Sequence, residues 1–301
     1  MGVNILVVKD TSTYKRVERI KDSGFSIDEL DHYSLVMQIG IYDLQFAVID
    51  SRNNQCLAIE DYRLKGIRTV NGRLKLVKQI LDNHEFLIAG FWKDVKLCLK
   101  THKFTLIPAN MFLQENAADY LALNSEIKTS FEEVYYYKQI SVDTINVFAV
   151  EIKLCRWIES IYKKKKVHII HQGSALVEGI LKHADHIEEK GMYCYIDRGI
   201  LHILVTENHK LLYYNQFAAR KKQDYLKYIL LVFSELGMNN KRHQVFLWGF
   251  IRPSSEEMIL LKKYIRNISF GSKPSFLKFR HVFDEIEDHQ YFDVMSGYLC
   301  M

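Results

Sequence analysis

Two short turns in this 301-residue chain place a glycine beside an aspartate between apolar runs. Gly40 and Asp43 lie in the first turn, and Asp197 and Gly199 in the second. Backbone N–H groups of such turns can hold phosphate oxygens, and carboxylates can hold the accompanying Mg²⁺. A single glycine per turn is equally explained by hairpin geometry, because glycine adopts positive φ at little cost.

The runs around both turns predict two similar β-meanders. Short apolar runs separated by Asp, Gly and Asn are typical of consecutive hairpins. The runs are residues 35–39, 44–49 and 55–62 in the first meander, and 193–196, 201–205 and 211–217 in the second. Helical spacing follows each meander, over residues 71–83 and 221–237, and Gly237 suits a helix stop. The sequence therefore predicts one unit used twice.

The remaining patterns predict further strands and helices. Asn110, Ser174, and Ser254 or Ser255 are the expected N-caps of three of the helices. The expected strands are residues 95–99, 104–107, 134–140, 145–150, 167–170 and 244–248. The expected helices are residues 110–124, 151–162, 175–183, 256–265 and 291–299.

Composition indicates a folded protein, and 301 residues can form one large domain or two medium ones. The chain is 48% hydrophobic, has three prolines and carries a formal charge of +5. So few prolines argue against long linkers, and so mild a charge does not by itself indicate nucleic acid. We expect an N-terminal extension over residues 1–33, a first domain over 34–150 and a second over 151–301.

Five widely spaced cysteines predict buried free thiols and a cytoplasmic location. The sequence contains no CxxC, HExxH or paired histidines at helical spacing, so we expect no metal site. It also has no apolar stretch long enough to cross a membrane, and the N-terminal apolar run is too brief for a signal peptide.

Three stretches resemble motifs of the actin, hexokinase and heat-shock ATPase superfamily, in which two ribonuclease-H-like domains flank a cleft. YIDRG (195–199) resembles the second phosphate loop, and HQVFLWGFI (243–251) resembles the adenosine motif that ends in Gly249. DVMSGYL (293–299) resembles the closing helix. The resemblance implies duplicated ribonuclease-H-like domains and ATP with Mg²⁺ in the cleft.

Nearly the whole chain resembles an uncharacterised bacterial family assigned an actin-like ATPase fold. That family has no known function, so the resemblance implies a fold and no activity. More distantly, the layout is similar to actin-like proteins of pilus and secretion machines, which act partly as assembly platforms. The matching stretches are residues 167–181, 210–217, 224–233 and 246–265.

The nucleotide motifs depart from the superfamily pattern. Gln38 stands where the superfamily carries aspartate, and bulky Ile41 and Tyr42 follow Gly40. Asp197 is retained, but Gly249 is followed by Phe250 rather than by more glycine. A degenerate nucleotide cleft would be formed by Asp197, Gly199 and Gly249, with Gln38 and Asp43 on the opposite side. The interpretation that no nucleotide binds is favoured.

The sequence also contains residue types of two other chemistries, ester or peptide hydrolysis and nucleic-acid binding. A hydrolase triad consists of a serine, a histidine and an aspartate, and the sequence places Ser174 and Asp185 near two histidines, His168 and His171. The sequence lacks the GxSxG elbow that would expose such a serine. A strand-end histidine and a capping serine are the favoured interpretation.

Basic residues 163–166 and 220–222 could contact nucleic acid through counterion release. Solvated helix ends are favoured, because cations suit a helix C-terminus. Tyrosines 135–137 and 213–214 are interpreted as half-buried strand rather than a base-stacking platform. We therefore expect no nucleic acid partner.

Together these patterns predict a cytoplasmic actin-like protein that has lost ATP hydrolysis, has no catalytic residues and binds a protein partner or itself. The alternative is an ATP-binding enzyme, an ATPase or kinase, that uses Asp197 with Asp43 on the facing domain. It would require ATP and Mg²⁺ as cofactors.

Overall fold

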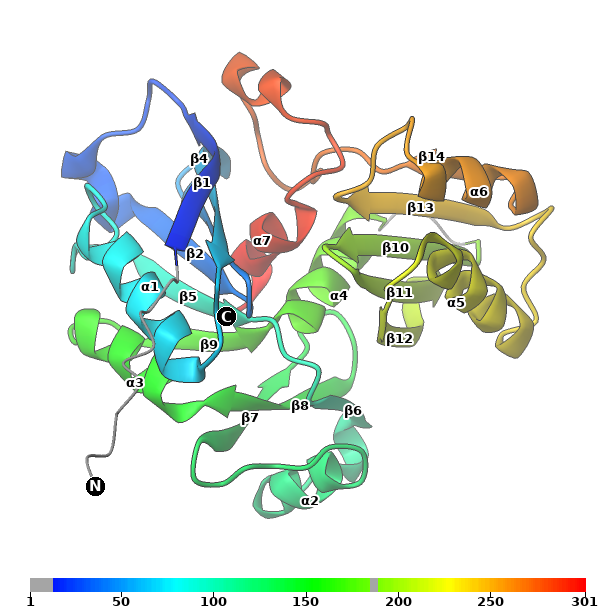
Figure 1. Cartoon of the computed structure of the whole chain (residues 1–301), viewed down its shortest axis with the longest axis horizontal. Helices are drawn as coiled ribbons and strands as arrows, with labels where there is room; N and C mark the ends of the chain where they lie inside the picture. The colour runs from blue at the N-terminus through cyan, green and yellow to red at the C-terminus, as the bar shows by residue number, and fades with distance from the viewer. Residues whose placement is uncertain (1–12, 185–188) are drawn as a thin grey trace, which may run out of the picture.

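The computed structural model describes residues 13–184 and 189–301. Two large sheets lie side by side with helices between them and on their outer faces (Figure 1). No helix in these residues is long and apolar enough to cross a membrane. All five cysteines are buried and free, as the sequence predicted.

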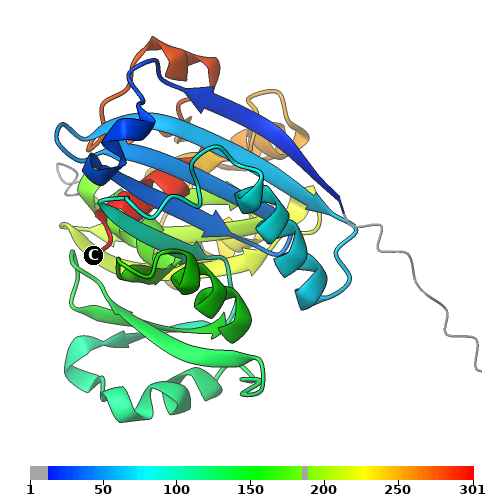
Figure 2. The ribbon, with the colours of Figure 1, turned by 90° about the vertical axis from the view of Figure 1, so that its left-hand side faces the viewer.

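The first sheet has the strand order β1-β4-β3-β2-β5-β9. Its meander β2-β3-β4 is antiparallel, whereas β5 is parallel to β2 and β9 is parallel to β5. Figure 2 shows these strands side by side. The bounds are β1 (Thr13–Lys21), β2 (Tyr33–Ile39), β3 (Asp43–Asp50), β4 (Gln55–Lys65), β5 (Asp94–Leu99) and β9 (Val167–His171).

The second sheet repeats this plan with the order β12-β11-β10-β13-β14. An antiparallel meander again occupies one side, and β13 and β14 add in parallel on the other. The predicted duplication is therefore confirmed. The bounds are β10 (Gly191–Asp197), β11 (Ile200–Glu207), β12 (Lys210–Ala218), β13 (Gln244–Gly249) and β14 (Ile268–Phe270).

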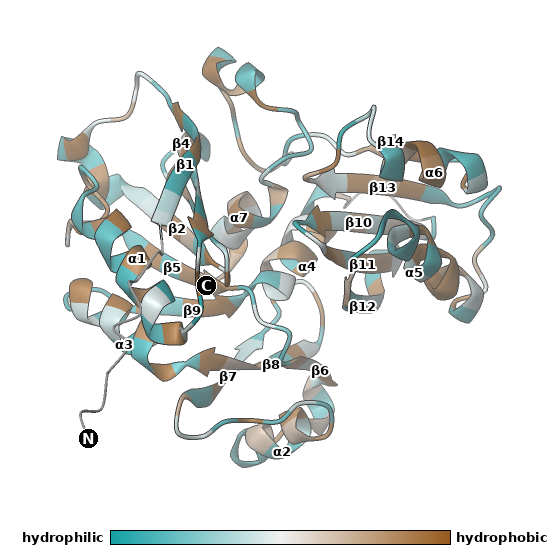
Figure 3. Ribbon diagram, viewed as in Figure 1, coloured by the Kyte–Doolittle hydropathy of each residue, from teal (hydrophilic) through white to brown (hydrophobic). Residues whose placement is uncertain are grey.

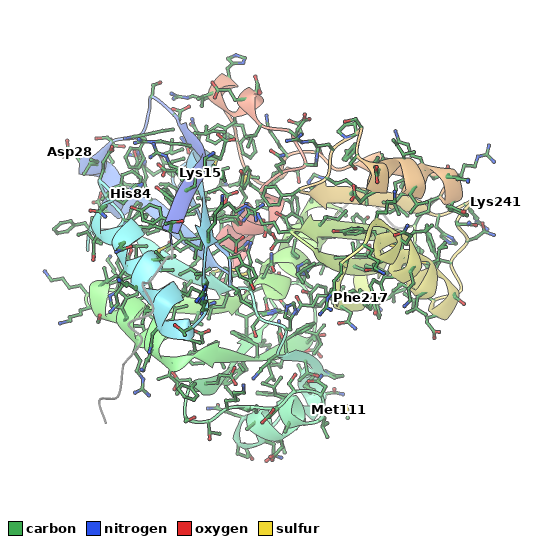
Figure 4. The ribbon with its side chains drawn as sticks, viewed as in Figure 1. Lys15, Asp28, His84, Met111, Phe217 and Lys241 are labelled. Atoms are coloured by element: carbon green, nitrogen blue, oxygen red, sulfur yellow. The ribbon has the colours of Figure 1, made fainter. Side chains whose placement is uncertain are left out.

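A smaller antiparallel sheet, β6-β8-β7, is inserted between β5 and β9. We call each large sheet with the helices packed on it a unit. Met111 lies at the outer end of this insertion, and Lys241 lies at the far end of the second unit (Figure 4). The bounds are β6 (Phe104–Pro108), β7 (Glu132–Lys138) and β8 (Thr144–Glu151).

The meander strands that begin each unit are buried on both faces, which explains their continuous apolar runs. Alternate side chains of β2 pack against α1 and α3 on one face and α7 on the other. Alternate side chains of β10 pack against α5 and α6 on one face and α4 on the other. Brown segments recur along the strands in Figure 3, and α1 and α5 show both colours, as helices with one buried face do.

The two central helices each cross from one unit to the other. α4 directly follows β9 of the first sheet but packs on the second sheet, and α7 follows the second unit but packs on the first. The two helices also contact each other. The helix bounds are α1 (Val70–Asp82), α2 (Ala117–Ala122), α3 (Ile152–Ile161), α4 (Gln172–His183), α5 (Lys222–Glu235), α6 (Glu256–Tyr264) and α7 (Phe292–Ser296).

Three local predictions were wrong. Residues 110–124 do not form one helix: two 3₁₀ turns precede α2, because only Ala117 and Leu121 find a buried surface while Met111 and Leu113 remain exposed. Asn110 is accordingly not an N-cap. Ser255 caps α6 as predicted.

Ser174 is not the N-cap of α4. The His171 side chain accepts a hydrogen bond from the Gly173 N–H, so α4 begins at Gln172. In the predicted N-terminal extension, residues 13–21 form the edge strand β1 and residues 1–12 lie outside the described part. The domain limits at residues 34 and 151 stay a prediction, although α3 and β9 belong to the first unit.

Candidate functional site

The two glycine–aspartate turns face each other across the gap between the sheets. A cavity of about 180 Å³ lies between them, and both turns line it. The turn after β2 contributes Gly40 and Asp43, and the turn after β10 contributes Asp197 and Arg198. The fold thus brings Asp43 and Asp197 together, although they lie half a chain apart, whereas Gln38, Gly199 and Gly249 do not line this cavity.

Lys100, which directly follows β5, occupies the space between the two aspartates. Its Nζ lies 2.6 Å from Asp43 Oδ2 and 2.8 Å from Asp197 Oδ2. Burial would lower the pKa of Lys100, but the carboxylates of Asp197 and Asp43 outweigh it and raise the pKa above its ordinary value. Lys100 is therefore a permanent cation that neutralises both turns.

Arg198 forms a second bridge between the units. Its guanidinium donates one hydrogen bond to Asp43 Oδ2 and another to Asp61 Oδ2, both from the first sheet. The same guanidinium lies over the Phe250 ring, 4.3 Å from its centre. Burial opposes the charge, but Asp43 and Asp61 raise the pKa of Arg198 above its usual value.

Asp197 is buried and ionised. Burial would raise its pKa, but Lys100 and Arg198 hold the pKa of Asp197 down to about 2. Its Oδ2 also accepts a 2.8 Å hydrogen bond from the Gln172 amide at the start of α4. Its Oδ1 has no hydrogen-bond partner among the described residues.

A further carboxylate, Asp293 of α7, lies behind this cluster. Its Oδ2 accepts hydrogen bonds from the amides of Gln172, at 2.8 Å, and Gln38, and its Oδ1 accepts one from the Tyr195 hydroxyl. Burial raises the pKa of Asp293; Lys100 opposes this and the nearby Asp197 reinforces it. Gln38 is thus an amide donor to Asp293, where another carboxylate would repel it.

The space beside Gly249 is filled by the backbone of Ile196. Its φ is +94°, and a Cβ there would lie 2.1 Å from the Ile196 carbonyl oxygen. The N–H of Gly249 donates to His289 O and the N–H of Phe250 to Ile196 O, both at 2.7 Å. The glycine at this turn is required by the close approach of the β10 backbone.

Gly199 serves the hairpin itself. Arg198 and Gly199 have φ of 53° and 91°. Asp197 pairs with Ile200, so the two residues form the loop of a two-residue hairpin with positive φ at both positions. This geometry is sufficient reason for the glycine.

Magnesium with a nucleotide does not fit this arrangement. Mg²⁺ requires oxygen ligands in a near-octahedral set. Asp43, Asp61 and Asp197 instead direct oxygens at Lys100 and Arg198. Within residues 13–184 and 189–301, no group of three or more His, Cys, Asp or Glu side chains is placed to hold a metal ion.

Sequence reasoning missed several members of the cluster. Lys100 could have been suspected because it is a cation that directly follows the expected strand 95–99. Asp293 could have been suspected as an acid inside a small, apolar helix. Asp61 and Gln172 carry no local signal, since their partners come from distant segments.

The hydrolase candidates do not form a catalytic group. The Asn146 amide donates to Ser174 Oγ at 2.9 Å and lies 3.2 Å from His171 Nδ1. Burial lowers the pKa of His171 to about 4, so the ring is a neutral helix cap. Asp185 lies outside the described residues.

Comparisons with known proteins agree with this architecture. A family model described as "Protein of unknown function (DUF3822)" matches residues 22–268. No curated protein matches the chain.

Two solved structures resemble the fold. The chain is similar to a Bacteroides thetaiotaomicron protein with an actin-like ATPase fold and unknown function, with a TM-score of 0.77 and 18% identity over 92% of this chain and 99% of that one. It is also similar to a chain of the PilM–PilN type IV pilus biogenesis complex, with a TM-score of 0.56 and 10% identity over 88% of this chain and 97% of that one. These similarities confirm the actin-like fold.

Proposed function

The chain belongs to the DUF3822 family of proteins of unknown function, and we propose that it is a non-catalytic binding or assembly module of the cytoplasm on an actin-like fold. It has a protein partner or associates with itself, and it does not hydrolyse ATP.

The observation that carries this proposal is the cation pair in the cleft. Lys100 and Arg198 neutralise the carboxylates that a Mg²⁺–nucleotide complex would need. A metal ion bound to these carboxylates would leave Lys100 and Arg198 buried without their partners, and removing one partner from a buried ion pair costs about 3–5 kcal/mol. Arg198 also joins the two units, which suits a scaffold of fixed shape.

The similarity to a chain of the PilM–PilN complex supports a partner-binding role. That complex is a protein assembly for type IV pilus biogenesis. It shows that a related fold serves in a protein complex, and we extend this role to the present chain as part of the proposal.

Thermal unfolding with and without millimolar Mg-ATP or Mg-ADP tests the loss of nucleotide binding. A ligand at a hundredfold excess over its Kd stabilises the native state by about 2.7 kcal/mol. We expect no nucleotide-specific shift of the Tm. A saturable shift that requires Mg²⁺ would overturn the proposal. Light scattering of the purified protein measures self-association independently.

One observation favours the alternative, an ATPase or kinase. The cavity between the turns exists, and buried Asp197 Oδ1 there has no hydrogen-bond partner among the described residues. A Mg-ATP-dependent activity that disappears in Asp197→Ala, and persists in an exposed control such as Asp119→Ala, would establish the enzyme.

A further inference from the structure

Two sequence features that lie apart in the chain line one groove. A cavity of about 520 Å³ lies between β7 and β9. Tyrosines 135–137 of β7 form one wall, and residues 166–170 form the other. Lys163 and Lys165, which follow α3, also line it. We call this the lysine–tyrosine groove.

Both walls of the groove are sheet edges. β7 is the last strand of the small sheet, and β9 is the last strand of the first sheet (Figure 1). Among the described residues, no backbone hydrogen bond joins the outer edge of β9 to another element. The two strands contact each other over part of their length, and the Glu132 N–H at the start of β7 donates to Lys128 O. Such an edge is a template for an additional strand.

The charge of the groove is predominantly positive. Lys163, Lys165 and Lys166 are exposed, and Glu159 is the one acidic side chain that lines the cavity in the described residues. Half-buried His168 also lines it; burial lowers the pKa of His168, Lys96 and Lys166 lower it further, and Asp94 opposes them. The complementary ligand is anionic.

The groove suits a peptide better than a nucleic acid. The tyrosines do not form a flat stacking platform: Tyr137 is buried, and the Tyr136 ring packs against Phe112 at 5.0 Å between ring centres. Free strand edges present alternating N–H and C=O groups, which match a peptide main chain. A sugar–phosphate backbone has no such pattern.

We propose that the lysine–tyrosine groove binds an extended acidic segment of a protein partner, which adds as a strand to the free edge of β9 and directs carboxylates at Lys163, Lys165 and Lys166. This inference rests on the proposed function and names the partner's chemistry and docking place.

The probe is a fluorescent heptapeptide of alternating glutamate and valine, and its lysine–valine counterpart is the charge control. Anisotropy at low salt should show saturable binding of the acidic peptide alone. K165E/K166E should weaken it about tenfold, because two exposed attractions become repulsions. K262E/K263E changes the net charge equally on exposed positions of α6 and should leave the affinity unchanged.

Hydrogen exchange locates the bound peptide. We expect slower exchange of β9 amides in the presence of the acidic peptide, and less protection of the same amides in K165E/K166E at the same peptide concentration. Absence of peptide binding, equal weakening by K262E/K263E, or protection confined to other strands would overturn the inference. Tighter binding of a single-stranded oligouridylate at the same lysines would overturn it in favour of nucleic acid.

These outcomes separate the two proposals. A nucleotide-dependent Tm shift would contradict the proposed function whatever the groove binds. If nucleotide has no effect and a stoichiometric partner binds equally to wild type and K165E/K166E, the proposed function stands and the groove assignment fails.

Discussion

Arg198 of the second unit forms a buried ion pair with Asp43 of the first, and this contact joins the two turns that flank the cleft. Both side chains are almost inaccessible to solvent, with 10% and 6% of their surfaces exposed. In an actin-like fold the corresponding turns would hold a nucleotide between the units, whereas here a side chain of one unit reaches the other directly.

Replacing Arg198 should destabilise the protein strongly. Arg198→Ala leaves Asp43 and Asp61 with less compensating charge, and we expect a loss of about 3–5 kcal/mol in the free energy of unfolding. Arg198→Lys should lose less, because one ammonium keeps the charge but cannot fork to both carboxylates. Urea denaturation measures both. Equal stability of Arg198→Ala and wild type would contradict the inter-unit role.

Two glycines with nearly the same φ should respond differently to alanine. Gly199→Ala introduces only positive-φ strain, since the nearest atom to its Cβ, Ala219 O, lies at 3.6 Å. We expect about 1–2 kcal/mol. Gly249→Ala adds an overlap with Ile196 O and should cost more than about 3 kcal/mol. Similar denaturation midpoints for the two variants would show that the packing at Gly249 is not needed.

The buried cap of α4 should make stability depend on pH. Burial lowers the pKa of His171 to about 4, compared with about 6.5 in an unfolded chain. Between these values the unfolded state binds the extra proton, so stability falls as the pH decreases from about 6.5 to 4. The slope contributed by one group is about 1.4 kcal/mol per pH unit.

His171→Asn provides the matched comparison for this pH dependence. Asparagine retains an acceptor for the Gly173 N–H but does not titrate. The variant should lose about 1.4 kcal/mol per pH unit of slope in this window, measured by urea denaturation at several pH values. An unchanged slope would mean that His171 does not titrate on unfolding as stated. Burial also lowers the pKa of His202, to about 3, so His202 contributes the same slope in both proteins and cancels in the comparison.

A methyl group added where α4 crosses α7 should lower the free energy of unfolding. A Cβ at Gly179 would lie 2.0 Å from Ser296 Oγ. Gly179→Ala should cost about 1–3 kcal/mol through overpacking. Ser296→Gly in the same chain should recover part of that loss, so a double-mutant cycle should give a non-zero coupling. Strict additivity of the two changes would contradict the contact.

Local sequence pattern determined the repeated meanders and most of the helices. Hydrophobic period and turn residues act over a few positions, so β2–β4, β10–β12 and α5 were predictable. The same local signal failed for residues 110–124, where α2 is short because only part of the segment finds a surface to pack on. The resemblance of 195–199 and 243–251 to known motifs identified the fold and pointed to Asp197.

Only the tertiary structure decided what the cleft contains. Arg198 and Asp61 are 137 residues apart, and no local pattern encodes their ion pair. The same holds for Lys100 between Asp43 and Asp197, and for Gln38 beside Asp293. Short-range pattern fixes the elements because backbone periodicity is local, whereas buried charges find partners only when separate elements pack together.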